Sequence, residues 1–129
     1  MLRPWLFALP LLAVPYALLG QTTDSLPPGV TPAMVGEGQK LFAGAGICGA
    51  CHGPDGKGVQ GLGANLTDAK WLHSDGSYEA IVRQILQGVT ADKSTTGVAM
   101  PPKGGSQLTE AQVRAVAAYV WTLARPKAK

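Results

Sequence analysis

Two thiols and an imidazole lie within five consecutive residues, Cys48-Gly49-Ala50-Cys51-His52. Cysteines three positions apart can form thioether bonds with the two vinyl groups of one haem, and a histidine that follows at once can ligate its iron. The chain contains only these two cysteines. The pentapeptide therefore predicts one covalent haem c, attached through Cys48 and Cys51, with His52 as an axial iron ligand.

Two other uses of these cysteines stay open at this point. A redox-active disulfide between Cys48 and Cys51 would suit an exported protein, but such a pair normally opens a helix after a strand, and no such pattern precedes it. A zinc site would need both cysteines with His52 and His73. Adjacent Cys51 and His52 are awkward as joint ligands, and no zinc spacing is matched.

The second axial ligand has three candidate side chains, Met34, His73 and Met100. Met34 falls on the apolar face of a predicted helix, where methionine usually fills the core. Met100 stands in the loop sequence Ala99-Met100-Pro101-Pro102, where the prolines would stiffen the segment that presents its sulfur. We expect Met100 as the sixth ligand, with His73 or an open position as alternatives.

Three segments carry helical signals, at residues 32–45, 77–87 and 109–124. Thr31 and Ser77 can cap the first two, and Thr109 with Gln112 can form a capping box before the third. Gly and Pro mark 53–68 and 89–107 as loops, and no strand pattern is present. The fold class is therefore all-α, with three main helices and long loops. So few helices bury a small core, which one haem would complete.

The ends of the chain differ in composition from the middle. Residues 1–20 have the charged start and apolar run of a signal peptide, or of a retained membrane anchor. We expect a linker at 21–31, the folded domain at 32–126 and a basic tail at 127–129. Export would place the domain in the periplasm or on the outer face of the cytoplasmic membrane, with possible membrane association through 1–20. The modest excess of Lys and Arg, 11 against 8 acidic residues, is no nucleic-acid signal.

From about Gly38 to Leu123 the chain resembles the class I cytochromes c, above all small bacterial mono-haem proteins and haem domains of terminal-oxidase subunits. The first helix carries a Gly-x-x-x-Phe pattern at Gly38 and Phe42, the haem-attachment pentapeptide is 48–52, and a glycine-rich loop follows at 53–58. The resemblance also includes an Asn-Leu-Thr segment at 65–67, Met-Pro at 100–101 and the last helix, matched at 108–110 and 118–120. It implies the cytochrome c fold, in which the first and last helices cross at Gly38 against an aromatic residue, here Tyr119.

The resemblance also suggests further haem contacts and shows two departures. Leu66 would line the proximal haem face, and Trp71 would either reach a haem propionate or pack in the core. Ala64 stands where the family often has proline before Asn-Leu, so the backbone carbonyl that accepts the second N–H of His52 is not identified. The spacer from Phe42 to Cys48 is also longer than is usual, so the first helix could end early.

A His/Met pair raises the reduction potential and closes the iron to other ligands, which favours electron transfer over catalysis. The sequence therefore predicts an electron carrier, not an enzyme, whose partners are redox proteins that dock briefly at an exposed haem edge. The alternative is a fixed electron-relay subunit of a larger oxidoreductase or terminal oxidase. An enzymatic or gas-sensing role would require an open sixth position.

Overall fold

The computed structural model describes residues 25–125. The predicted signal at 1–20, part of the linker and the tail at 127–129 lie outside these residues. The described chain contains four α-helices and one 3₁₀ helix: α1 (Pro32–Ala43), α2 (Cys48–His52), α3 (Tyr78–Gln87), η1 (Pro102–Gly105) and α4 (Glu110–Leu123). Between residues 25 and 125 the extended pairing is limited to two isolated bridges, Val59 with Gly63 and Val89 with Met100. The all-α prediction is confirmed.

The second and third predicted helices begin where their capping residues placed them. The Ser77 hydroxyl accepts a hydrogen bond from the Ala80 amide, and α3 ends at Gln87, capped by Gly88 with a φ of 73°. At the start of α4, the Thr109 side chain accepts from the Gln112 amide while the Gln112 side chain accepts from the Thr109 amide. Both caps satisfy amides that the first helical turn leaves without partners.

The first helix is shorter than predicted, and the cysteines lie on a helix of their own. The prediction of a helix to residue 45 was wrong, because α1 ends at Ala43 and Gly44 caps it. The amide of Gly46 then turns back to the Leu41 carbonyl at 2.7 Å. Ile47 takes a left-handed conformation, with a φ of 50°, and α2 starts at the next residue. The longer spacer therefore forms a turn that separates the haem motif from α1.

The first and last helices cross in close contact, as the resemblance implied. A Cβ atom on Gly38 would overlap the Ala115 carbonyl oxygen and come within 3.0 Å of the Tyr119 Cβ. The rings of Phe42 and Tyr119 meet edge to face with centroids 5.4 Å apart, a preferred geometry for aromatic pairs. The absence of a side chain at Gly38 thus sets the distance between α1 and α4.

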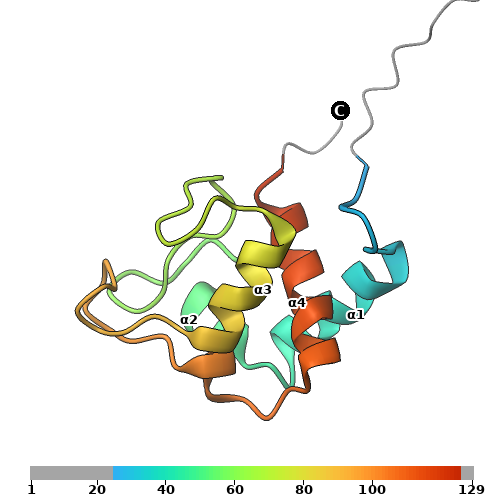
Figure 1. Cartoon of the computed structure of the whole chain (residues 1–129). Helices are drawn as coiled ribbons and strands as arrows, with labels where there is room; N and C mark the ends of the chain where they lie inside the picture. The colour runs from blue at the N-terminus through green and yellow to red at the C-terminus, as the bar shows by residue number, and fades with distance from the viewer. Residues whose placement is uncertain (1–24, 126–129) are drawn as a thin grey trace, which may run out of the picture.

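Helix α4 forms the centre of the core and contacts both α1 and α3. Its inner face is fully buried at Val113, Val116 and Ala117. Figure 1 shows the long loops gathered beside α2 and α3, on the side of the molecule away from α1. Within residues 25–125 no helix has both the length and the apolarity needed to cross a membrane. The helices therefore form the core, and the loops beside α2 and α3 enclose the site.

Candidate haem-binding site

A large cavity opens between α2, α3 and the loops that follow them. It encloses about 1310 Å³ not filled by protein atoms, open solvent at its mouth included. Its inner wall is apolar and comes mostly from the helices, through Phe42, Ile81, Ile85, Val116 and Val120, with Leu108 added from the segment before α4. Such a wall suits a flat apolar ligand, and the side chains on the remaining walls decide which one.

Helix α2 places both cysteines at this cavity, and no disulfide joins Cys48 to Cys51. The Cys48 Sγ donates to the Gly46 carbonyl at 3.3 Å. Burial raises the pKa of the Cys48 thiol, whereas redox-active CxxC cysteines have a lowered pKa. Burial therefore disfavours a thiolate at Cys48.

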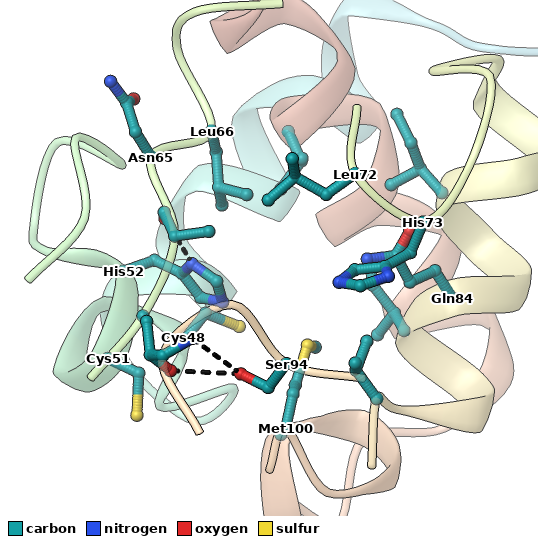
Figure 2. A pocket seen from close by; sticks show the side chains of 18 of the residues that line it. Cys48, Cys51, His52, Asn65, Leu66, Leu72, His73, Gln84, Ser94 and Met100 are labelled. Atoms are coloured by element: carbon teal, nitrogen blue, oxygen red, sulfur yellow. Dashed lines mark hydrogen bonds between the residues drawn. The ribbon is translucent and has the colours of Figure 1, made fainter. Parts of the chain in front are cut away.

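The orientation of His52 is set by a backbone hydrogen bond. Its Nδ1 lies 2.8 Å from the Ala64 carbonyl oxygen. Since a carbonyl only accepts, Nδ1 carries the proton, and the lone pair of the imidazole is on Nε2. Figure 2 shows the ring directed into the open space of the cavity. Alanine at position 64 thus supplies the carbonyl that the sequence left unidentified.

The loop that carries Ala64 lies unusually close to α2. A Cβ atom on Gly63 would overlap the backbone carbonyl of Cys51. The Gly58 amide also donates to the His52 carbonyl at 2.7 Å. Glycines in this loop therefore allow its backbone to reach His52. The number of glycines in the sequence indicated a close backbone approach here but not its partner.

The three candidates for the second axial position are placed differently. Met100 and His73 both line the cavity, whereas Met34 packs partly buried against the core and is absent from the cavity wall. In Figure 2 the Met100 sulfur and the His52 imidazole face the same open space from separate elements, and His73 stands across that space from His52. The structure thus separates Met34 from the other two candidates.

Leu66 and Trp71 also line the cavity. The amide of Leu66 donates to the Gly56 carbonyl at 2.7 Å, which fixes this part of the loop. The Trp71 indole lies against Gly76, where a Cβ atom would overlap the ring. The indole packs on Gly76 at the cavity, and a hydrogen bond from it to a haem propionate stays a prediction.

Gln84 is a cavity residue that the sequence reasoning missed. Its Oε1 is buried without a hydrogen-bond partner, and no other side-chain nitrogen or oxygen of the described chain has this property. It lines the cavity together with His73, and Figure 2 shows the two side chains on the same wall. Its position three residues after Ile81, on the inner face of α3, was a signal that could have identified it.

The residues around the cavity match the chemistry of a c-type haem. Two thiols, an imidazole with a free Nε2 and a thioether meet in one apolar space. Over residues 25–125 there is no group of three or more His, Cys, Asp or Glu side chains that could hold a metal ion. This finding gives no support to the zinc alternative, and the donor set fits haem.

The fold and this site define the chain as a cytochrome c domain. Cytochrome cL from the marine methylotrophic bacterium Methylophaga aminisulfidivorans has a similar solved structure, with a TM-score of 0.54 over 70% of this chain and 53% of that one. The two sequences are 23% identical. The structural likeness therefore confirms the fold alone.

The chain belongs to the family of cytochrome c oxidase, cbb3-type, subunit III, whose model matches residues 33–120. The CcoP subunit of the cbb3-type cytochrome c oxidase of Rubrivivax gelatinosus is 39% identical over 68% of this chain and 25% of that protein. The CcoP subunit of Cereibacter sphaeroides is 43% identical over 68% and 27%, and the FixP subunit of Azorhizobium caulinodans 40% identical over 74% and 29%.

This membership confirms the predicted resemblance to the haem domains of terminal-oxidase subunits. The chain spans about a quarter of the length of these relatives. All three are oxidase subunits, so they favour the alternative of an electron-relay subunit over that of a free carrier.

Proposed function

We propose that this domain binds one haem c and relays single electrons within a cbb3-type oxidase. Cys48 and Cys51 would hold the haem through two thioether bonds, and His52 and Met100 would ligate its iron. The observation that carries this proposal is the single apolar cavity at which both thiols, the oriented imidazole and the Met100 side chain meet. When bound, the haem iron supplies a one-electron redox couple.

The side chains around the cavity prepare it for this role in three ways. The Ala64 carbonyl holds His52 in the tautomer whose Nε2 can ligate iron. Met100 offers a soft thioether, which favours the reduced iron and raises the potential. The apolar inner wall, to which Phe42 and Val116 contribute, disfavours water at the site.

Family membership supports the relay role within an oxidase. Relatives that share about two fifths of the aligned residues are subunits of cbb3-type oxidases. The partners would then be the other subunits of that complex, on the outer face of the cytoplasmic membrane. Residues 1–20 would serve either as a cleaved signal or as the tether to that membrane.

The absorption spectrum of the purified holoprotein tests the haem site. We expect a pyridine haemochrome typical of two thioether bonds, and a weak sulfur-to-iron band near the red end of the ferric spectrum. A vinyl-type haemochrome would overturn the covalent attachment. Absence of the sulfur band, together with rapid carbon monoxide binding by the reduced protein at neutral pH, would overturn ligation by Met100.

Purification from the native membrane tests the relay role. With a C-terminal affinity tag and mild detergent, the chain should co-purify with cytochrome c oxidase activity and carry one haem by intact mass. A variant with Met100→Ala controls for assembly, since it should be retained in the complex but transfer electrons slowly. A chain recovered free in the soluble fraction, with residues 1–20 removed, would contradict the relay and support a mobile carrier.

A further inference from the structure

The backbone of Met100 is tied to the end of α3 by a two-way bridge. The Val89 amide donates to the Met100 carbonyl at 2.8 Å, and the Met100 amide donates to the Val89 carbonyl at 2.9 Å. Residues 90–99 between them form a loop that is mostly exposed. The position of Met100 therefore depends on its partner at Val89 more than on the loop that leads to it.

Gly88 lets this bridge form at short range. It has a φ of 73°, and a Cβ atom here would overlap the Met100 carbonyl oxygen and lie 2.8 Å from the Pro101 carbonyl carbon and the Pro102 nitrogen. Any side chain would have to displace the backbone that carries the methionine. Gly88 is thus required by a close backbone approach as well as by its conformation.

The partner of Met100 is a rigid one. The Gly88 amide donates to the Gln84 carbonyl at 2.8 Å, so the bridge continues directly from the last turn of α3. That helix buries Ile81, Val82 and Ile85 and packs against both α4 and η1. Protein interiors pack densely, so the helix end keeps its place while exposed loops move.

We propose that Gly88 and Val89 are positioning residues, which hold the Met100 backbone so that its sulfur is presented at the sixth iron position. This inference rests on the proposed function, in which Met100 is that ligand. The bridge keeps the sixth position closed because it fixes the backbone of Met100. The exposed loop at 90–99 contributes little to the position of that backbone. Displacing the bridge should therefore change the iron site without removing the methionine.

A matched pair of glycine substitutions tests the positioning role. Gly97 lies in the same loop with nearly the same φ, 74°, but a Cβ atom there would meet nothing within 4 Å. Gly88→Ala and Gly97→Ala thus add the same methyl group at nearly the same φ, and only the first pushes on Met100. We expect Gly88→Ala to lose the sulfur-to-iron band, lower the reduction potential and bind carbon monoxide. Gly97→Ala should keep the wild-type spectrum.

Met100→Ala serves as the reference that separates this proposal from the proposed function. If Met100→Ala loses the band while Gly88→Ala keeps it with an unchanged potential, the positioning role is overturned and the ligand assignment stands. If Met100→Ala leaves the band and potential unchanged, the ligand assignment itself fails. Loss of the band in both variants, with both haem thioethers intact by mass, supports the positioning role.

Hydrogen exchange of the wild-type holoprotein gives a readout that does not require Gly88→Ala to fold. The bridge predicts slow exchange at the Val89 and Met100 amides, comparable with the amides of α3. The amide of Val98, which bonds only to the Thr96 side chain at 3.3 Å, should exchange much faster. Exchange at Met100 as fast as at Val98 would show that no stable bridge exists and would overturn the proposal.

Discussion

Ile47 takes a backbone conformation that its side chain disfavours, one residue before the haem motif. Its φ and ψ are 50° and 15°, in the left-handed region. β-branched residues are rare there, because the Cβ atom crowds the following carbonyl. The Ile47 amide donates to the Gly44 carbonyl at 2.9 Å, and the Ile47 carbonyl accepts from Ala50 at 3.1 Å. These bonds hold the strained residue where α2 begins.

Comparison of Ile47→Gly with Ile47→Ala measures this strain. Both variants remove the same half-exposed side chain, but only glycine relieves the left-handed conformation. We expect Ile47→Gly to be more stable than Ile47→Ala by about 1 kcal/mol in chemical denaturation. An alanine variant as stable as the glycine variant, or more so, would show that residue 47 is not left-handed in solution.

The hydrogen bond of the His52 imidazole shows why alanine in place of proline at position 64 need not remove a function. Ala64 replaces the proline that related sequences often have, yet its carbonyl oxygen still accepts from Nδ1 at 2.8 Å. The contact uses the backbone, which alanine and proline share. A side-chain pattern alone therefore could not decide whether the hydrogen bond is made.

Between elements, the crossing of α1 and α4 depends on one glycine. Gly38 is buried where the Ala115 carbonyl and the Tyr119 Cβ would meet any side chain. The adjacent Phe42 is 1% exposed and packs edge to face on Tyr119. Moving the helices apart would loosen this aromatic contact and the buried face of α4 together.

A pair of alanine substitutions on α1 tests this crossing. Gly38→Ala should lower the free energy of unfolding by about 3 kcal/mol, at the upper end of the cost of overpacking a core. Gly36→Ala, two residues away and with no atom within 4 Å of the added Cβ, should raise it by about 0.5–1 kcal/mol. Thermal or urea denaturation of both holoproteins gives the comparison, and equal effects would contradict the crossing.

In the molecule as a whole, the cavity continues the hydrophobic core, because core residues line its inner wall. Buried side chains of α1, α3 and α4, among them Phe42, Ile81 and Val116, line its inner wall. Haem bound there would complete the apolar packing that the helices begin. Folding and cofactor attachment are thus linked in this domain, since the same apolar surface serves both.

Removal of the haem measures this link. A double variant, Cys48→Ser with Cys51→Ser, changes two sulfurs to oxygens and leaves the rest of the cavity intact. Without bound haem it should lose at least about 3 kcal/mol of stability, the cost of deleting one large aromatic group from a core. Circular dichroism during heating, with haem content checked by absorbance, provides the test. A haem-free variant that melts like the holoprotein would refute the link.

The lysines Lys57 and Lys103 have different surroundings. Lys57 pairs with Asp55 at 2.8 Å on the exposed surface, and the hydrogen bond from Lys57 lowers the pKa of Asp55. Lys103 is half-buried and lines the cavity. Exposed ion pairs add little to stability and are screened by salt. A fixed place in a complex would need less charge steering than a mobile carrier.

Much of the fold could be predicted because the signals for it are local. Capping residues located the starts of α3 and α4, and the pentapeptide with its family context identified the haem chemistry, because both depend on neighbours in the chain. The end of α1 was predicted two residues too late, because glycine also occurs within helices and Gly44 alone does not mark where a helix stops. The left-handed conformation of Ile47, which starts α2, has no sequence signal of its own.

What the sequence by itself determined is the chemistry of this domain: the two thiols, the imidazole and a short list of sulfur and nitrogen candidates for the sixth position. Only the tertiary structure placed Met100 on the cavity wall and Met34 away from it, identified the Ala64 carbonyl and brought Gln84 and the Val89–Met100 bridge to the cavity. The physical reason is that these contacts join backbone groups and side chains far apart in the chain. Residue types report what a group can do, whereas folding decides which groups meet.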